Sequence, residues 1–165
     1  MTKSQLTYNN KLLVDLQKSL KERYYIEVGI LGGAASQVHS DSSYTNAQIG
    51  AVHEFGSFSR NIPRRSFLYD PIKEGVDDLM QDGVMNNLFN KYAKANAIRK
   101  WYLLLESYCE SFVNNAFVSS FRGRWADLKR STVARRKQKG NVQQFPLMDT
   151  GQLRRSISGR VVKIK

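Results

Sequence analysis

Residues 98-IRKWYLLLESYCESFVNNAF-117 carry the apolar pattern that decides the fold. Large apolar side chains recur every three or four positions over about five turns, which is the spacing of one face of an α-helix. This stripe consists of Ile98, Trp101, Leu105, Tyr108, Phe112 and Phe117. We therefore expect one long helix that forms the centre of the core. Cys109 lies on the flank of the stripe, where a buried and unreactive thiol is expected.

Upstream of this helix, the chain first predicts another helix and then a strand. Residues 8–23 predict an amphipathic helix with Leu13, Leu16 and Leu20 on its apolar face. Residues 24-YYIEVGIL-31 are rich in aromatic and β-branched side chains that alternate, which predicts a strand. The small polar residues 32–46 predict an extended, mobile loop.

Two further helices are expected before the core helix. Asn46 can cap a short helix that runs to Phe55 and ends at Gly56. The pair Asp70-Pro71 predicts the start of the second helix, with a carboxylate at the N-cap and proline at the first helical position. Gly83 and residues 90–97 are possible breaks in the helical stretch that follows.

The C-terminal quarter completes an α+β domain that spans residues 1–165. Trp125, Leu128 and Thr132 fall on one helical face, residues 149–157 predict a short turn or helix, and residues 157–165 predict a terminal strand. We expect a small antiparallel sheet packed against one or two long helices, with an extended loop and a basic C-terminal arm over 121–165.

The positive charge of the chain is concentrated at its C-terminal end. The 165 residues carry a formal charge of +12; residues 121–165 hold 13 Lys and Arg against two acids, and residues 1–120 hold 13 against 12. Such asymmetry indicates nucleic acid or an acidic protein surface as partner. Its candidate contact residues are Arg130, Arg135, Arg136, Lys137 and Lys139. Non-specific binding of DNA through this basic arm is therefore the alternative function.

No membrane span, disulfide, metal site or cofactor is expected. The sequence lacks a run of about 18 apolar residues, and a single cysteine excludes an internal disulfide. His53-Glu54 begins like a His-Glu-x-x-His zinc motif, but Ser57 occupies the position of the second histidine. An acid–base pair at His53 and Glu54 is the weakest hypothesis, because adjacent helical side chains point about 100° apart. Nucleotide-binding and nucleophile-elbow glycine motifs are absent, so we expect no enzyme.

Two blocks of sequence resemble tailed-phage virion morphogenesis and tail-completion (neck) proteins. The first block is 53-HEFG-56 followed by 62-IPRRSFL-68, and the second runs from Trp125 through Leu128, Thr132 and Arg136 to 147-LMDTGQLRRSI-157. Both blocks occur in the order typical of the family. The motif residues are Glu54, Phe55, Gly56, Pro63, Arg65, Phe67, Trp125, Asp149, Thr150, Gly151 and Leu153. Ser66 replaces the usual second proline, which removes a φ constraint from this turn.

The resemblance implies a structural protein at the head–tail junction of a virion, assembled in the host cytoplasm. Its implied partners are further copies of itself in a ring, the tail terminator, tail tube, head-closure or tape-measure proteins, and packaged DNA. We expect Phe55 to be buried and Arg64 and Arg65 to point outward. The side chain of Asp149 or Thr150 is expected to cap the turn that follows.

Overall fold

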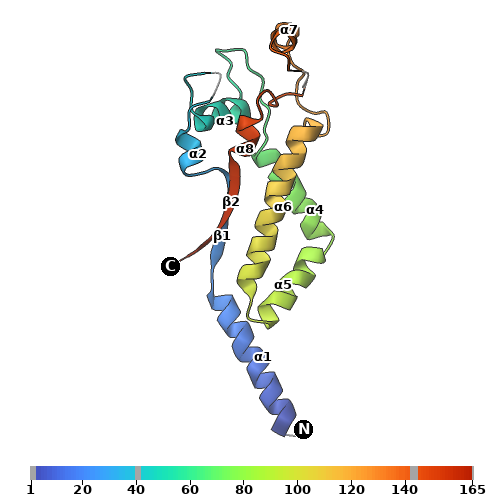
Figure 1. The fold of residues 1–165 in the computed structure, drawn as a ribbon. Coiled ribbons are helices and arrows are strands. Elements are labelled where there is room, and N and C mark those ends of the chain that lie inside the picture. Colours follow the sequence, from blue (N-terminus) through green and yellow to red (C-terminus); the bar gives the residue numbers. More distant parts are fainter. Residues whose placement is uncertain (1–2, 40–41, 142–144, 165) are drawn as a thin grey trace.

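The computed structural model describes residues 3–39, 42–141 and 145–164. Within these residues the chain forms eight helices and a two-stranded antiparallel sheet, which packs against the long helix α6 (Ile98–Ser119; Figure 1). The expected α+β fold, with a small antiparallel sheet on a long helix, is confirmed in this form.

The sheet pairs a strand from the first part of the sequence with a strand from its last part. Strand β1 (Tyr24–Ile30) pairs with β2 (Ile157–Lys163) in a register that places Tyr24 opposite Lys163 and Ile30 opposite Ile157. The backbone amide of Gly159 in β2 donates a hydrogen bond to the Glu110 carboxylate of α6. Because the strands lie more than 120 residues apart in sequence, the sheet closes the fold.

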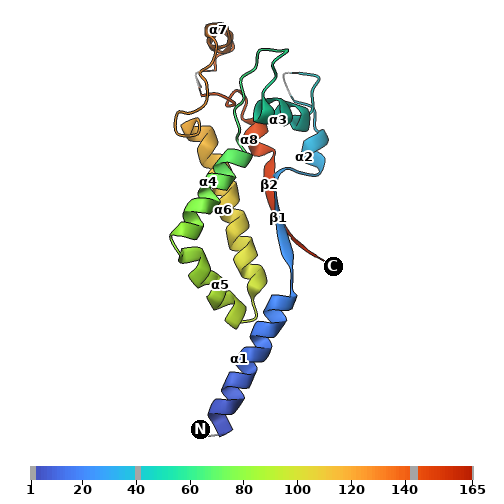
Figure 2. The same ribbon diagram turned by 180° about the vertical axis from the view of Figure 1, so that it is seen from behind.

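Helix α6 lies between the sheet and two other helices. Helices α4 (Tyr69–Gln81) and α5 (Val84–Lys94) flank it on the side away from the sheet (Figures 1 and 2). The buried residues of α6 are Ile98, Leu105, Cys109, Val113, Ala116 and Phe117. Burial, followed by the nearby Glu106, raises the pKa of the Cys109 thiol to about 11. The expected burial of this thiol is confirmed.

Helix α1 (Lys3–Lys21) extends away from the body of the molecule and contacts α5 (Figure 1). Ser19 is buried there, and its hydroxyl donates a hydrogen bond of 2.8 Å to the carbonyl of Ala93 in α5. Leu16 packs nearby, but Leu13 and Leu20 are 56% and 58% exposed. The expected apolar face of this helix is therefore largely uncovered.

Several element boundaries differ from the expected ones. Helix α3 (Asn46–Phe55) is capped by Thr45, whose side chain accepts from the Gln48 amide, while Asn46 is buried inside the first turn. Helix α4 begins one residue before Asp70, which lies in its first turn. The expected loop contains the short helix α2 (Gly33–Ser36), and α5 continues to Lys94.

The backbone after α6 turns left-handed instead of forming the expected helix around Trp125. Ser120, Phe121, Arg122 and Gly123 have φ values of 49°, 51°, 55° and 75°. L-residues adopt this region at a cost of roughly 1–2 kcal/mol each, so packing has to stabilise the turn. It directs the Phe121 and Trp125 side chains into the core.

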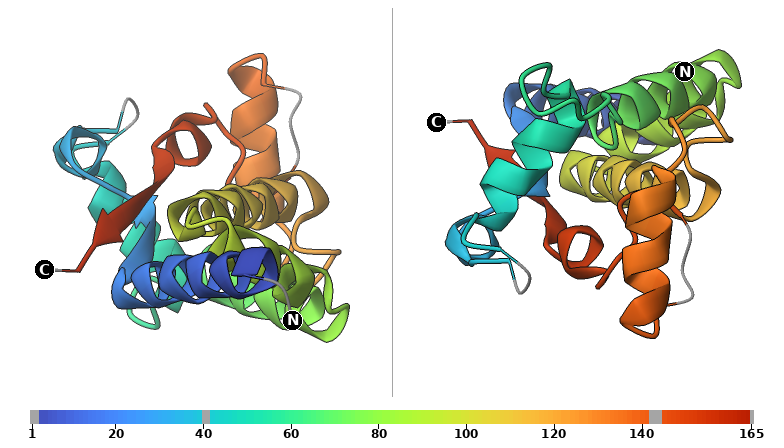
Figure 3. Two further views of the ribbon diagram at one scale, coloured as in Figure 1. Left: turned by 90° about the horizontal axis from the view of Figure 1, so that it is seen from below. Right: turned by 90° about the horizontal axis from the view of Figure 1, so that it is seen from above.

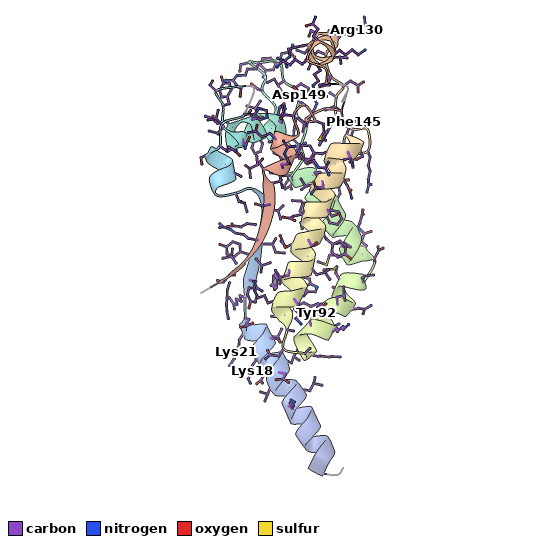
Figure 4. The ribbon with its side chains drawn as sticks, in the orientation of Figure 1. Lys18, Lys21, Tyr92, Arg130, Phe145 and Asp149 are labelled. Atoms are coloured by element: carbon purple, nitrogen blue, oxygen red, sulfur yellow. The ribbon has the colours of Figure 1, made fainter. Side chains whose placement is uncertain are left out.

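The basic C-terminal segment is only partly an arm. Helix α7 (Arg130–Gln138) stands at the periphery (Figure 3), and Figure 4 labels Arg130, its first residue. The chain then returns through α8 (Gln152–Arg155) to β2, and Leu153 joins Phe121 and Trp125 in the core. Residues 121–165 are therefore also an integral part of the fold.

Candidate functional site

The two sequence blocks that carry the resemblance meet at one end of the molecule. Phe67 of the first block and Trp125 and Leu153 of the second belong to one buried cluster with Phe117 of α6. The Phe117 ring centroid lies 5.3 Å from that of Phe67 and 5.9 Å from that of Trp125. The blocks, more than 50 residues apart in sequence, thus build one structural unit, which we call the motif junction (residues 53–68, 125–127 and 147–157).

Glu54 is buried at the end of α3 and binds the start of α4. Its carboxylate accepts hydrogen bonds from Ser66 Oγ (2.6 Å) and from the backbone amides of Phe67 (2.9 Å), Leu68 (3.0 Å) and Tyr69 (3.1 Å). Amides at a helix start have no carbonyl partner within the helix, and the helix dipole favours a negative charge there. Glu54 therefore ties α3 to α4.

Ser66, which stands where the resembled family has a second proline, adds hydrogen bonds to this connection. Its hydroxyl donates to Glu54 and accepts from the backbone amide of Asp70 at 3.0 Å. A proline at this position has no side-chain hydrogen-bonding group and makes neither contact. Ser66 replaces a backbone constraint with two hydrogen bonds.

Phe55 is 77% exposed, so the expectation that it is buried is wrong. Successive helical residues are about 100° apart, and Glu54 takes the inward direction. Gly56 follows with φ of 77°, and a Cβ atom there would lie 2.9 Å from the Arg64 nitrogen. This close approach lets residues 57–62 form a hairpin, closed by reciprocal backbone bonds of 2.9 Å between Ser57 and Ile62.

Arg65 is buried, so the expectation that it points outward is also wrong. Its guanidinium donates to the carbonyl of Ala126 at 2.8 and 2.9 Å and to the carbonyl of Asp127 at 3.0 Å. Its backbone amide donates to the carbonyl of His53 at 2.8 Å. Arg65 thus connects both blocks, whereas the exposed Arg64 pairs with Asp70 at 2.8 Å.

Arg136 is buried as well, which removes it from the expected set of DNA or acidic-partner contacts. Its Nη1 donates to the carbonyl of Phe145 at 3.0 Å, and its Nε lies 3.6 Å from the Asp149 carboxylate. Asn141 Nδ2 donates to the same carboxylate at 2.6 Å. These contacts fix the end of α7 to the loop before α8. The other expected contacts, Arg130, Arg135, Lys137 and Lys139, are exposed on or beside α7.

The Asp-Thr-Gly turn positions Leu153 for burial. Thr150 Oγ1 accepts from the Gln152 amide at 3.2 Å, so Thr150 is the capping residue, while the Asp149 carboxylate faces Arg136 and Asn141. Gly151 has φ of 72°, where a side chain would be strained. The expected side-chain bond to the turn is thus made by Thr150.

His53 and Glu54 face different surroundings. No described residue bonds the buried Nδ1 of His53. Burial, followed by the charge of Arg65 and by His39, lowers the pKa of His53 from 6.5 to about 4. The imidazole is therefore neutral at pH 7, and the Glu54 carboxylate is directed at α4.

The described ranges contain no group of three or more His, Cys, Asp or Glu arranged for a metal ion. Among the helices of the same ranges, none is long and apolar enough to span a membrane.

Two polar residues beside the motif junction have roles that the sequence does not indicate. Asn46 is fully buried; its Nδ2 donates to the Ala34 carbonyl at 3.0 Å, and its Oδ1 accepts from Gln152 Nε2 at 3.0 Å. Asn141 bridges to Asp149 as described above. Their partners lie in other elements, so periodicity does not reveal their roles.

Comparison of the chain with protein-family models, curated proteins and solved structures gives no match.

Proposed function

We propose that this chain is a structural protein of the head–tail junction of a tailed phage. It would complete the tail or neck by assembling with further copies of itself and docking onto terminator, tube or connector proteins. The observation that carries this proposal is the convergence of the two motif blocks on Phe67, Trp125 and Leu153. A resemblance spread over distant segments has a physical basis when those segments form one unit.

The contacts that the motif residues make also support a structural role. Glu54, Arg65, Thr150 and Gly151 are engaged in holding backbone segments together. Phe55, in contrast, lies on the surface beside the exposed Tyr69 and an apolar pocket of about 670 Å³ whose lining includes Leu68 and Ile72. Exposed aromatic groups next to an apolar pocket are typical of protein–protein contacts.

We assign this surface to a second copy of the chain. Leu13, Val14 and Leu20 of α1 are exposed. Helix α1 lies at the opposite end of the molecule from α3 (Figures 1 and 2). Neither surface can cover the other within one chain. Two different surfaces that complement each other between copies give a head-to-tail contact, which closes into a ring when the rotation permits.

Light scattering coupled to gel filtration tests the proposal. The purified chain is expected to form a closed multimer, and the double variant Phe55→Ser/Tyr69→Ser is expected to dissociate. Phe145→Ser, which changes an exposed aromatic residue elsewhere, is the matched control and should leave the multimer intact. A chain that stays monomeric at high micromolar concentration and binds no tail or head component overturns the proposal. If the multimer forms, electron cryomicroscopy of the intact virion would show where the ring lies.

A further inference from the structure

The edge of β1 that faces away from β2 carries unpaired backbone groups. In an antiparallel pair, opposite residues alternately bond each other and turn their N–H and C=O groups away from the partner strand. The Ile164 amide donates to the Arg23 carbonyl at 2.8 Å, so the bonded pairs continue from there at every second residue. Among the described residues, no hydrogen bond reaches the backbone groups that therefore face outward on β1, those of Tyr24, Ile26, Val28 and Ile30.

The outward edge of β2 is covered over its first half only. The amide of Gly159 turns away from β1 and donates to the Glu110 carboxylate of α6. Glu106 lies against the same residue, where a Cβ atom would overlap its carboxylate. In the second half, the outward backbone groups of Val161 and Lys163 have no hydrogen-bond partner within the part of the chain that the structure describes. The two unbonded edges face opposite directions, because they belong to the two strands of one sheet.

The β1 edge borders the surface that the proposed function assigns to a second copy. The apolar pocket of about 670 Å³ is lined by Val28 together with Phe55, Leu68 and Tyr69. The pocket therefore lies beside outward backbone groups of β1. A strand that adds to a sheet edge gains main-chain hydrogen bonds and places alternate side chains in neighbouring pockets. This edge offers both features.

The unbonded half of β2 borders the other surface of the same contact. The Lys163 ammonium pairs with a Glu22 carboxylate oxygen at 2.6 Å, and Ile164 bonds Arg23, which lies between α1 and β1. The end of β2 thus lies beside the last turn of α1, where Leu20 is exposed. Ile164 is also exposed.

We propose that the second half of β2 in one copy adds to the β1 edge of the next copy, so that one antiparallel sheet continues from copy to copy. This inference rests on the proposed function and adds a backbone component to its head-to-tail contact. Unpaired strand edges are templates for association, and a closed arrangement of strands abolishes them. Two β1 strands paired about a two-fold axis would leave β2 unbonded in both copies, whereas β1–β2 pairing uses both edges of every copy in a ring.

Proline at position 26 tests the edge on the full chain. Ile26→Pro removes an outward N–H and leaves the bonds of Tyr25 and Glu27 to β2 in place. Ile26→Ala shortens the same side chain, keeps the N–H and is the matched control. In light scattering, the Ile26→Pro multimer is expected to dissociate at a protein concentration at least about tenfold higher than the Ile26→Ala multimer. Equal concentrations for the two variants would overturn the inference.

Hydrogen–deuterium exchange at single residues tests the edge without any change in β1. In the multimer of the unmodified chain, the amides of Ile26 and Val28 are expected to exchange at least about tenfold more slowly than in the same chain diluted to the monomer. The Glu27 amide, which bonds to β2, is the internal control and should be protected in both states.

The outcomes separate this inference from the proposed function. A multimer whose Ile26 and Val28 amides exchange as fast as those of the monomer overturns the inference and leaves the proposed function standing. A chain that forms no multimer also overturns the inference, and one that in addition binds no tail or head component overturns the proposed function as well.

Discussion

The indole nitrogen of Trp125 donates a buried hydrogen bond of 3.1 Å to the backbone carbonyl of Ser66, across 59 positions of sequence. The next residue of the first block, Phe67, packs in the same cluster as the Trp125 ring, and Arg65 binds the carbonyls of Ala126 and Asp127. Three consecutive residues thus each contact the segment around Trp125 or its cluster. The two blocks are therefore expected to unfold together.

Glu54→Gln is expected to lower the free energy of unfolding by about 2–4 kcal/mol. The Gln amide group would bring N–H donors toward amides that themselves need an acceptor. Urea denaturation followed by circular dichroism measures the loss. Glu74→Gln, which changes an exposed ion pair with Arg124, is the matched control and should leave the midpoint almost unchanged. Equal midpoints for the two variants would refute the role of Glu54.

Arg65→Lys is expected to destabilise the fold by about 1.5–3 kcal/mol although the charge is kept. An ammonium group on a flexible stem cannot reproduce the three planar contacts that the guanidinium makes to Ala126 and Asp127. The neighbouring exposed residue offers the control, since Arg64→Lys should have little effect. Thermal denaturation compares the two, and a tolerated lysine at position 65 would contradict the prediction.

Gly75→Ala is expected to destabilise the fold by about 1–3 kcal/mol, even though alanine has a higher helix propensity than glycine. A Cβ atom at this position of α4 would overlap the Phe112 ring of α6. Gly33→Ala in α2 meets no atom within 4 Å and is the control, with neutral or slightly raised stability expected. A stabilised Gly75→Ala variant would show that α4 and α6 lie further apart than described.

His53 is expected to make stability depend on pH between about 4 and 6.5. Its pKa is lowered in the folded state, so the unfolded chain binds more protons in this window. Stability is full above pH 6.5 and falls as the pH drops toward 4, by up to about 3 kcal/mol. Denaturation of His53→Asn across this range should show a flatter profile than the unmodified chain. An unchanged profile would assign the pH dependence to other groups.

The sequence by itself determined the elements whose signals are local. The apolar stripe of residues 98–117, the alternation of residues 24–31 and the Asp-Thr-Gly turn each produced the expected helix, strand and turn. These signals are strong because each element must present its apolar side chains at its own period. The burial of Cys109 followed from its place on the flank of the apolar stripe.

Only the tertiary structure decided which way the residues of the motif junction point. Phe55 is exposed and Arg65 is buried, the reverse of what their chemistry predicts. Glu54 points inward to bind the start of α4, which leaves Phe55 outside, and Arg65 binds the backbone carbonyls of residues 126–127. The left-handed turn at 120–123 likewise depends on segments brought together by folding. The hydrophobic period of a segment depends only on residues close together in sequence. A buried charge, in contrast, is stabilised by partners that are distant in sequence and that only folding brings beside it.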